Sequence, residues 1–329
     1  MVFIEDGIEI ALYNLISHLD KHRYKIYVNY TDKNAFQLLE KKIGNYCEYI
    51  DIDKEIHVDI LIYCNYVSKI AEKDIKNIKY KKSYFWFHCF GENQEKFLEK
   101  VCKEKLVDKI ITVCESIRKG LLNIEYLKGK ENKVITLKNI LDTVEIKAKS
   151  QENVDIPKAK DLTMIVIARL VKEKGFVRVK RLLEYMQEKN IDYKLLIVGT
   201  ANTEEQVNEI KEMFRDDENV LFLGYQENPY KYLKICDYNV LLSDSENMSL
   251  SLLEAKILGI PNIVTDFPSA PEEVTELKNG FILSREDTDS YKDKVDLILK
   301  EKSNLKYNLK DFKYDLEDII DKWEQILNE

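Results

Sequence analysis

Two glutamates eight positions apart, Glu246 and Glu254, are the residues whose type and setting most clearly suggest chemistry in this chain. Glu246 lies in a polar loop, Ser243–Asn247, that follows a predicted strand, and Glu254 lies inside the predicted helix that comes next. Carboxylate oxygens accept several hydrogen bonds, so this pair suits the hydroxyl groups of a sugar or a ribose. The alternative is a solvated loop charge and an ordinary helix surface charge. Glu254 argues against that alternative, because its helix is strongly apolar and a carboxylate there needs a partner.

The helix that carries Glu254 is predicted from about Ser249 to Leu258. Ser249 suits the N-cap position, Gly259 ends the helix and Pro261 prevents its continuation. The backbone amides of a first helical turn have no partner within the helix. They therefore favour an anion or a sugar hydroxyl in front of them.

A pair of cations follows the predicted strand 163–167. Arg169 and Lys174 stand five positions apart across a tight turn that Gly175 closes. A guanidinium offers phosphate oxygens a fork of N–H groups and an ammonium acts as a point charge, so the two suit a diphosphate. The alternative is a solvated basic loop. Arg169 carries more weight than Lys174, because arginine is rare among the 51 basic residues of this chain.

A histidine in the first half is a further candidate. His88 ends the apolar strand that contains Tyr84, Phe85, Trp86 and Phe87. A side chain at the carboxyl end of such a strand can reach a ligand in the crevice there. A histidine satisfied within the core is an equally good interpretation.

Strands and helices alternate along the whole chain and position these residues. Short apolar strands separated by helix-period segments are typical of parallel sheets that are covered on both faces. The predicted strands are 25–29, 59–65, 83–88, 109–113, 133–137, 163–167, 194–198, 220–223, 238–242 and 262–265, and the predicted helices include 9–20, 177–189, 204–214 and 229–236. The fold class is therefore α/β, with two doubly wound Rossmann-like domains, and the crevice between the two is the expected active site.

The polar stretch 146–162 contains Pro157 and is the expected link between the domains. We predict a first domain over 1–150, a second over 151–305, and a C-terminal helix over 306–329 that packs back toward the first domain. Only Val2, Phe3 and Ile4 precede the first loop, fewer than a central strand usually has. Either this strand is truncated or the native chain begins upstream.

The motifs of the second half together resemble those of glycosyltransferase family 4, whose members have the GT-B fold. The segments that carry this resemblance are IARLVKEKG (167–175), KLLIVG (194–199), VLFLGYQENPYKYLKICD (220–237), SENMSLSLLEAKILGIPNIVTD (245–266) and NGFIL (279–283). The first half is similar to the family more faintly, through EDGIEIALYNLISHLD (5–20), WFHCFGE (86–92), DKIITVCESIRKGL (108–121) and LKNILD (137–142). Two glutamates at this spacing are not by themselves a specific signal of the family, but this ordered set of segments is.

The resemblance implies a retaining, metal-independent transferase that moves a sugar from a nucleotide sugar, with UDP as the best guess for the nucleotide. It implies that the second domain binds this donor and that the first domain serves the acceptor, a glycan or lipid-linked glycan of polysaccharide biosynthesis. Arg169 and Lys174 would hold the donor diphosphate, and Glu246 the hydroxyls of the transferred sugar. Glu254 would bind the ribose, and His88 would sit over the sugar from the first domain.

The remaining residues that the resemblance implies lie in loops. The amides of Asn247, Met248 and Ser249 would contact the phosphate or the sugar, and Tyr225 and Gln226 would lie against the base. The three residues after Glu246 replace the small or glycine-containing turn that the family usually has, so we expect a narrower sugar pocket or a changed sugar preference.

The first domain departs from the family in its N-terminal loop. Gly7 would let the backbone approach the phosphate, but it is single where the family commonly has a glycine pair, and Asp6 stands beside it. A carboxylate close to a diphosphate is unfavourable unless it turns away or contacts the acceptor.

Composition limits the partners. A net charge of −8 argues against sequence-independent nucleic-acid binding. The chain has no long apolar run, no export signal and no metal-ligand spacing among its cysteines, so we expect a cytoplasmic protein. The resemblance implies that it uses no metal or other cofactor.

A run of six lysines in the first domain suggests peripheral contact with the anionic inner surface of the membrane, or else a solvated helix and turn. The run consists of Lys69, Lys73, Lys76, Lys79, Lys81 and Lys82. Two alternatives to a transferase stay open: a non-catalytic GT-B subunit that binds a partner transferase or a glycan, and a nucleotide-sugar epimerase.

Overall fold

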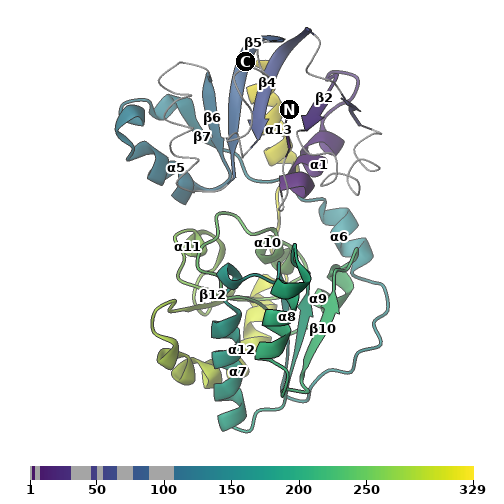
Figure 1. The fold of residues 1–329 in the computed structure, drawn as a ribbon, viewed down its shortest axis with the longest axis vertical. Helices are drawn as coiled ribbons and strands as arrows, with labels where there is room; N and C mark the ends of the chain where they lie inside the picture. The colour runs from purple at the N-terminus through teal and green to yellow at the C-terminus, as the bar shows by residue number, and fades with distance from the viewer. Residues whose placement is uncertain (1, 4–7, 31–45, 50–54, 65–76, 89–106) are drawn as a thin grey trace. The chain divides into compact units, whose positions relative to one another are not determined.

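The computed structural model describes residues 2–3, 8–30, 46–49, 55–64, 77–88 and 107–329 (Figure 1). They belong to two compact units, the first made of Met1–Leu141 together with Asp315–Glu329 and the second of Asp142–Tyr314. Each unit contains a parallel sheet with helices, of four strands in the first unit and six in the second. The predicted α/β class with two parallel sheets is therefore confirmed.

The main sheet of the first unit has the order β4-β5-β6-β7, and a smaller parallel sheet has the order β1-β2-β3. The strands are β1 (Val2–Phe3), β2 (Tyr27–Tyr30), β3 (Glu48–Tyr49), β4 (Ile56–Cys64), β5 (Ile78–Phe87), β6 (Lys109–Thr112) and β7 (Val134–Thr136). Among the described residues before 142, the helical elements are α1 (Ile8–His18), α5 (Glu115–Leu122), η2 (Glu125–Leu127) and η3 (Glu131–Lys133).

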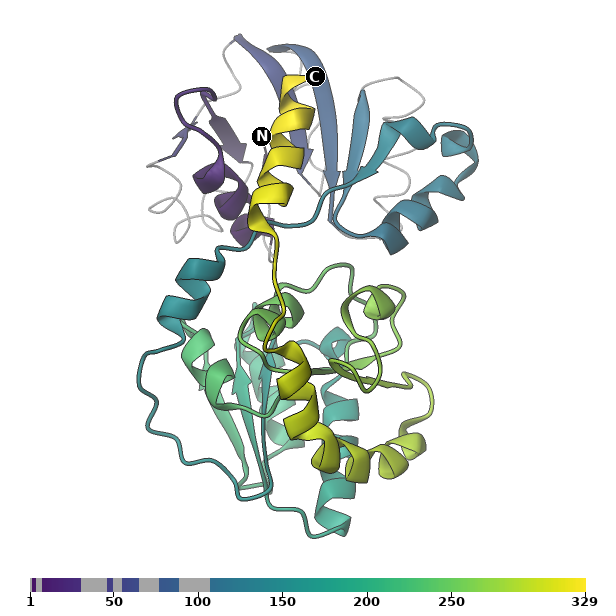
Figure 2. The ribbon, with the colours of Figure 1, turned by 180° about the vertical axis from the view of Figure 1, so that it is seen from behind.

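The last helix of the chain, α13 (Leu316–Asn328), belongs to the first unit and lies along its main sheet (Figure 2). Trp323 is fully buried there, and its ring meets Trp86 of β5 edge to face with the centroids 4.8 Å apart. The hydroxyl of Tyr84 donates to the carbonyl oxygen of Ile326 at 2.9 Å. The apolar stripe of this helix thus completes the core of the unit that contains the N-terminus.

The sheet of the second unit has the order β10-β9-β8-β11-β12-β13, and all its strands are parallel. The strands are β8 (Leu162–Ile167), β9 (Tyr193–Val198), β10 (Val220–Gly224), β11 (Tyr238–Leu241), β12 (Asn262–Thr265) and β13 (Gly280–Leu283). The chain winds outward from β8 in one direction and then from β11 in the other. Ligands of such sheets bind at the carboxyl ends of the two strands where the winding reverses.

Helices cover both faces of this sheet, which explains why its strands are apolar almost throughout. Helix α7 packs against α8 and α12, and α10 packs against α6 and α9. The helical elements are α6 (Thr143–Lys149), η4 (Lys172–Lys174), α7 (Phe176–Glu188), α8 (Glu204–Met213), α9 (Tyr230–Ile235), α10 (Leu250–Ile257), α11 (Ala270–Glu273), η5 (Thr288–Ser290) and α12 (Tyr291–Leu309).

Helix α6 occupies part of the stretch that the sequence predicts to be a polar link. It begins at a carboxylate cap, because the side chain of Asp142 accepts hydrogen bonds from the amides of Val144 and Glu145. The helix carries one buried side chain, Ile146. Its length of seven residues is too short to show a clear apolar period in the sequence.

The C-terminal tail is not one helix from residue 306 onward. Helix α12 ends at Leu309 in the second unit, and α13 begins at Leu316 in the first. The side chain of Asp315 caps the new helix by accepting a hydrogen bond from the amide of Asp318. The five residues before this cap carry the chain from one unit to the other.

Candidate functional site

Two of the residues predicted to bind a diphosphate and a sugar, Lys174 and Glu246, meet at the switch point of the second sheet. Arg169 and Lys174 follow β8, and Glu246 follows β11, the neighbouring strand at which the winding reverses. The ammonium nitrogen of Lys174 lies 2.6 Å from Oε1 of Glu246. Residues that are 72 positions apart in the chain therefore share one charged site.

A glycine allows the two loops to approach so closely. Gly175 has a φ of 70°, and a Cβ atom built on it would lie 1.8 Å from the carbonyl oxygen of Leu242. Next to it, the carbonyl oxygen of Glu173 accepts a hydrogen bond of 2.9 Å from the amide of Asp244. Any other residue at 175 would push the turn that carries Lys174 away from the end of β11.

Hydrogen bonds fix the carboxylate of Glu246. Ser243 donates to Oε1 at 2.7 Å, so this oxygen accepts both the serine and Lys174. Ser243 is itself fully buried, and its carbonyl oxygen accepts from the hydroxyl of Thr265 at 2.5 Å. The hydroxyl of Ser269 holds the carbonyl oxygen of Glu246 at 2.8 Å. Among the described residues none donates to Oε2, which leaves this oxygen available for a ligand.

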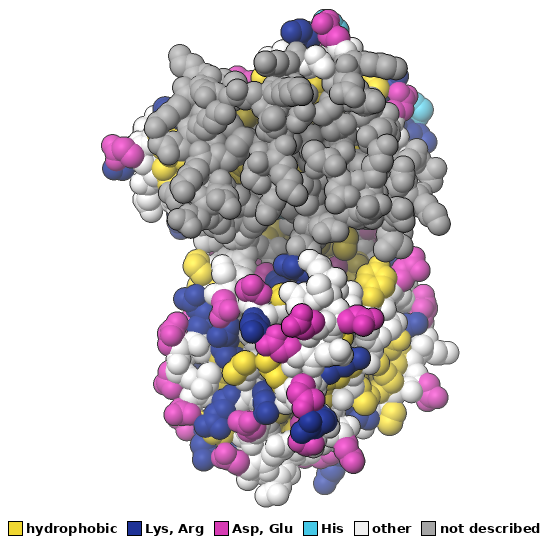
Figure 3. Space-filling model, viewed as in Figure 1, with side chains coloured by type: hydrophobic (Ala, Val, Ile, Leu, Met, Phe, Trp, Pro, Cys, Tyr) yellow, Lys and Arg dark blue, Asp and Glu magenta, His cyan; other side chains and the backbone are white. Residues whose placement is uncertain are grey.

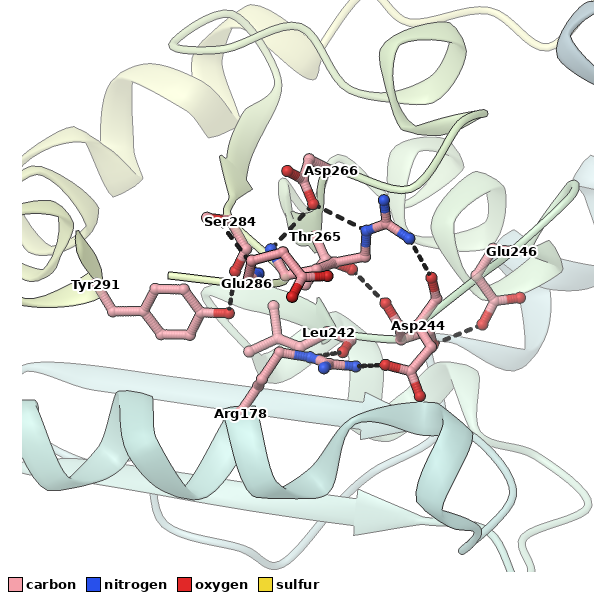
Figure 4. Close-up of polar contacts among 11 residues, drawn as sticks. Arg178, Leu242, Asp244, Glu246, Thr265, Asp266, Ser284, Glu286 and Tyr291 are labelled. Carbon is pink, nitrogen blue, oxygen red and sulfur yellow. Dashed lines mark hydrogen bonds and ion pairs between the residues drawn. The ribbon is translucent and has the colours of Figure 1, made fainter. Parts of the chain in front are cut away.

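Two arginines that the sequence analysis did not single out hold the same loop. Arg178 of α7 donates to the carbonyl oxygen of Leu242 at 2.7 Å and to the carboxylate of Asp244 at 2.5 Å (Figure 4). Arg285 follows β13 and donates to the carbonyl oxygen of Asp244 at 2.9 Å and to Asp266 at 3.0 Å. The network ties the ends of β11, β12 and β13 together. In the sequence, only the scarcity of arginine could have pointed to these two residues, because the groups that they bind lie at least 19 positions away along the chain.

Glu254 has the buried position that its apolar helix predicts. It is 7% exposed, and the hydroxyl of Tyr230 in α9 donates to its Oε1 at 3.2 Å. Burial raises the pKa of Glu254 to about 7, and the hydrogen bond from Tyr230 offsets a part of this rise. The expectation that this carboxylate needs a partner is therefore correct, and a solvated helix surface position is excluded.

The start of α10 lies close to Glu246 in the chain. Ser249 occupies the N-cap position with extended backbone angles, but its side chain makes no capping hydrogen bond. Its hydroxyl instead lies 3.1 Å from that of Ser251. Met248 is 8% exposed and packs inward, whereas Asn247 is half-buried. The side chain of Met248 thus supports the loop, and this residue can offer a ligand only its backbone amide.

The predicted base-side loop begins where β10 ends. Tyr225 is 64% exposed, an unusual degree for a large aromatic ring. Gln226 is fixed on both sides, because it donates to the carbonyl oxygen of Leu223 at 2.7 Å and accepts from the hydroxyl of Tyr232 at 3.2 Å. The loop therefore presents an aromatic face at the carboxyl edge of the sheet.

The first unit holds the other two predicted residues. His88 follows β5 and its ring packs against that of Trp86 at a tilt of 52°, with the centroids 4.3 Å apart. Burial lowers the pKa of His88 to about 3, so the imidazole is neutral at physiological pH and does not serve as a cation. Gly7 lies outside the described residues, as do Lys69, Lys73 and Lys76 of the lysine run.

The described surface gives a mixed picture of charge. Figure 3 shows acidic and basic side chains interspersed over the visible face of the second unit. On β5, Lys81 pairs with Asp59 at 2.6 Å, and both are well exposed.

No helix in the described part of the chain has both the length and the apolar character for a bilayer crossing. The same residues contain no cluster of three or more metal-ligating side chains.

Comparisons with known proteins concern the family and the fold of the chain. A family model described as glycosyl transferases group 1 matches residues 147–314, which is just over half of the chain. An uncharacterized glycosyltransferase of Haemophilus influenzae is 23% identical over 304 residues, which cover 91% of this chain and 82% of that protein. The N-acetyl-alpha-D-glucosaminyl L-malate synthase of Bacillus anthracis is 31% identical over 137 residues, which cover 40% of this chain and 36% of that protein.

A solved structure extends the likeness to both units. Anabaena HepE in complex with UDP matches with a TM-score of 0.76 at 15% sequence identity, over 98% of this chain and 96% of that one. At this identity the match establishes the fold.

Proposed function

Because the chain belongs to the glycosyl transferases group 1 family and has the GT-B fold, it is a glycosyltransferase, and we propose that its donor is a UDP-sugar. The acceptor is a hydroxyl group of a glycan or lipid-linked glycan, and the transfer retains the anomeric configuration. The observation that carries the proposal is the contact between Lys174 and Glu246 at the switch point. Lys174 lies on the loop that also bears Arg169.

Arg169 and Lys174 would bind the diphosphate of the donor. Breaking the bond between the sugar and the diphosphate builds negative charge on the terminal phosphate oxygens. Cations already held in position stabilise this charge without a large rearrangement. Lys174 satisfies this condition, since Glu246 and the turn closed by Gly175 fix it. We propose that these two cations and the amides of Asn247–Ser249 serve this purpose.

The two glutamates would recognise different parts of the donor. Oε2 of Glu246 is available for a hydroxyl of the transferred sugar, while Oε1 is held within the protein. Glu254 lies inside α10, hydrogen-bonded to Tyr230, and would accept the hydroxyls of the ribose. The exposed ring of Tyr225, with Gln226 next to it, would lie against the uracil.

The first unit would serve the acceptor. A neutral imidazole can donate or accept a hydrogen bond, so we propose that His88 contacts the sugar by hydrogen bonding and not by charge. The acceptor hydroxyl can lose its proton to an oxygen of the leaving phosphate. In that case no dedicated base of the protein is required. The role that we propose for Gly7 is to let the backbone approach the phosphate.

The choice of nucleotide and sugar rests on the relatives. HepE was solved with UDP, and the Bacillus anthracis relative is named for transfer of an N-acetylglucosaminyl group. A hexose or N-acetylhexosamine on UDP is therefore the donor that we propose to test first.

Thermal unfolding with a panel of UDP-, GDP- and ADP-sugars tests the proposal. We expect a UDP-sugar to raise the Tm and to undergo slow hydrolysis, with both effects lost in Arg169→Ala and the hydrolysis lost in Glu246→Ala. An isomerised nucleotide sugar would instead identify an epimerase. A chain that binds no nucleotide sugar would be a non-catalytic subunit, and the proposal would be wrong.

A further inference from the structure

The ammonium of Lys174 has an anionic partner within the protein. Its nitrogen lies 2.6 Å from Oε1 of Glu246, and the two side chains are only 20% and 11% exposed. An ion pair that is shielded from water to this degree interacts more strongly than one on the open surface. The cation that would bind a diphosphate is therefore already engaged by a carboxylate.

Glu246 cannot easily turn away from Lys174. Ser243 holds the same oxygen at 2.7 Å, and Ser269 holds the main-chain carbonyl of Glu246 at 2.8 Å. Both serines are buried, at 0% and 2% exposure. A diphosphate that arrives at Lys174 consequently meets a fixed negative charge, whether it displaces the carboxylate from the ammonium or shares the ammonium with it. Two anions this close repel each other.

The transferred sugar offsets the repulsion between Glu246 and the diphosphate. Its hydroxyl groups are hydrogen-bond donors, and Oε2 of Glu246 is the oxygen left available for one. A hydroxyl that donates to a carboxylate forms a strong, charge-assisted hydrogen bond. An intact nucleotide sugar therefore compensates the carboxylate, whereas a free nucleoside diphosphate brings a second anion and no hydroxyl at this position.

We propose that the Lys174–Glu246 pair makes the site prefer the intact nucleotide sugar over the nucleoside diphosphate product. This proposal rests on the proposed function. After transfer, Glu246 loses its hydroxyl donor and again competes with the diphosphate for Lys174. The pair thereby favours release of the product and limits product inhibition.

Calorimetric titration of the full chain with UDP, UMP and the UDP-sugar identified by the panel tests the proposal. In the wild type we expect UDP to bind more weakly than the UDP-sugar. In Glu246→Gln we expect UDP to bind about tenfold more tightly than in the wild type, because the competing charge is gone. The UDP-sugar should gain nothing, and UMP, which has no second phosphate, should change by less than about twofold.

Glu173→Gln is the matched control. Glu173 adjoins Lys174 on the same turn, but its side chain is exposed, so its removal should change UDP binding by less than about twofold. Lys174→Met should weaken UDP binding. The inference is overturned if Glu246→Gln leaves UDP binding unchanged or weaker, if Glu173→Gln gives the same gain, or if the wild type already binds UDP more tightly than the UDP-sugar. If the wild type binds neither UDP nor any nucleotide sugar, the proposed function itself fails.

Discussion

The burial of Glu254 makes the stability of the protein depend on pH. Its pKa is raised from 4.5 to about 7, so the folded protein favours the protonated carboxyl group. The stability that this provides is complete below pH 4.5 and disappears as the pH rises through about 7. Above that pH the folded chain holds a buried charge. The raised pKa corresponds to a cost of about 3 kcal/mol at most.

Glu254→Gln should therefore stabilise the protein at pH 8 and not at pH 4. Glutamine is neutral at both values and can still accept the hydrogen bond from Tyr230. We expect urea unfolding at pH 8 to show a gain of about 1–3 kcal/mol in the free energy of unfolding. The same variant should bind UDP less tightly, since it lacks the carboxylate that we propose to bind the ribose. An equal effect at both pH values would contradict the argument.

Ser243 is a positioning residue for Glu246. Removal of its hydroxyl in Ser243→Ala leaves Oε1 of Glu246 with Lys174 alone. A hydrogen bond to a charged group contributes about 1.5–3 kcal/mol, so we expect kcat/KM to fall by about tenfold or more. Ser245→Ala in the same loop is the control, because its side chain is exposed. Steady-state kinetics that show equal losses in the two variants would remove Ser243 from this role.

At the scale of elements, the loops after β8 and β11 form one unit because of a glycine. In Gly175→Ala the new Cβ would lie 1.8 Å from the carbonyl oxygen of Leu242, and the φ of 70° adds strain. We expect a loss of stability well above the cost of about 1–2 kcal/mol for a left-handed backbone alone. Donor binding should be lost with it, because Lys174 moves away from Glu246.

Gly259 provides the comparison for this variant. Its φ is 72°, but a Cβ there meets nothing within 4 Å. Gly259→Ala should therefore lose only about 1–2 kcal/mol in thermal or urea unfolding and keep its affinity for UDP. If both alanine variants bind UDP equally well, the close approach at residue 175 is not what positions Lys174.

The elements of the second sheet were predictable, because buried parallel strands are apolar throughout and the helices between them have a clear period. The pair of loops with Arg169, Lys174 and Glu246 was predictable for the same reason, since the carboxyl ends of neighbouring strands meet at one edge. Helix α6 was missed, although Asp142 is a good cap, because seven residues show no period. Arg178 and Arg285 were missed because their partners are distant in sequence and no local pattern encodes them.

At the scale of the whole molecule, the residues that we propose to bind the donor and the C-terminal helix belong to different units. Arg169, Lys174, Glu246 and Glu254 all lie within Asp142–Tyr314, whereas α13 completes the core of the other unit through Trp323. Stability of the first unit and affinity for the donor should therefore respond to different substitutions.

Trp323→Ala tests this separation. Loss of a fully buried tryptophan from its contact with Trp86 should cost the first unit about 3–5 kcal/mol. We expect unfolding to separate into two transitions, with the earlier one moved to lower temperature, while UDP binding at 15 °C stays within about twofold of the wild type. Trp323→Phe keeps an aromatic ring in the core and should restore most of the stability. A large loss of UDP affinity in Trp323→Ala, with the second transition unchanged, would contradict this separation. It would mean that the first unit contributes directly to donor binding, because the substitution destabilises that unit alone.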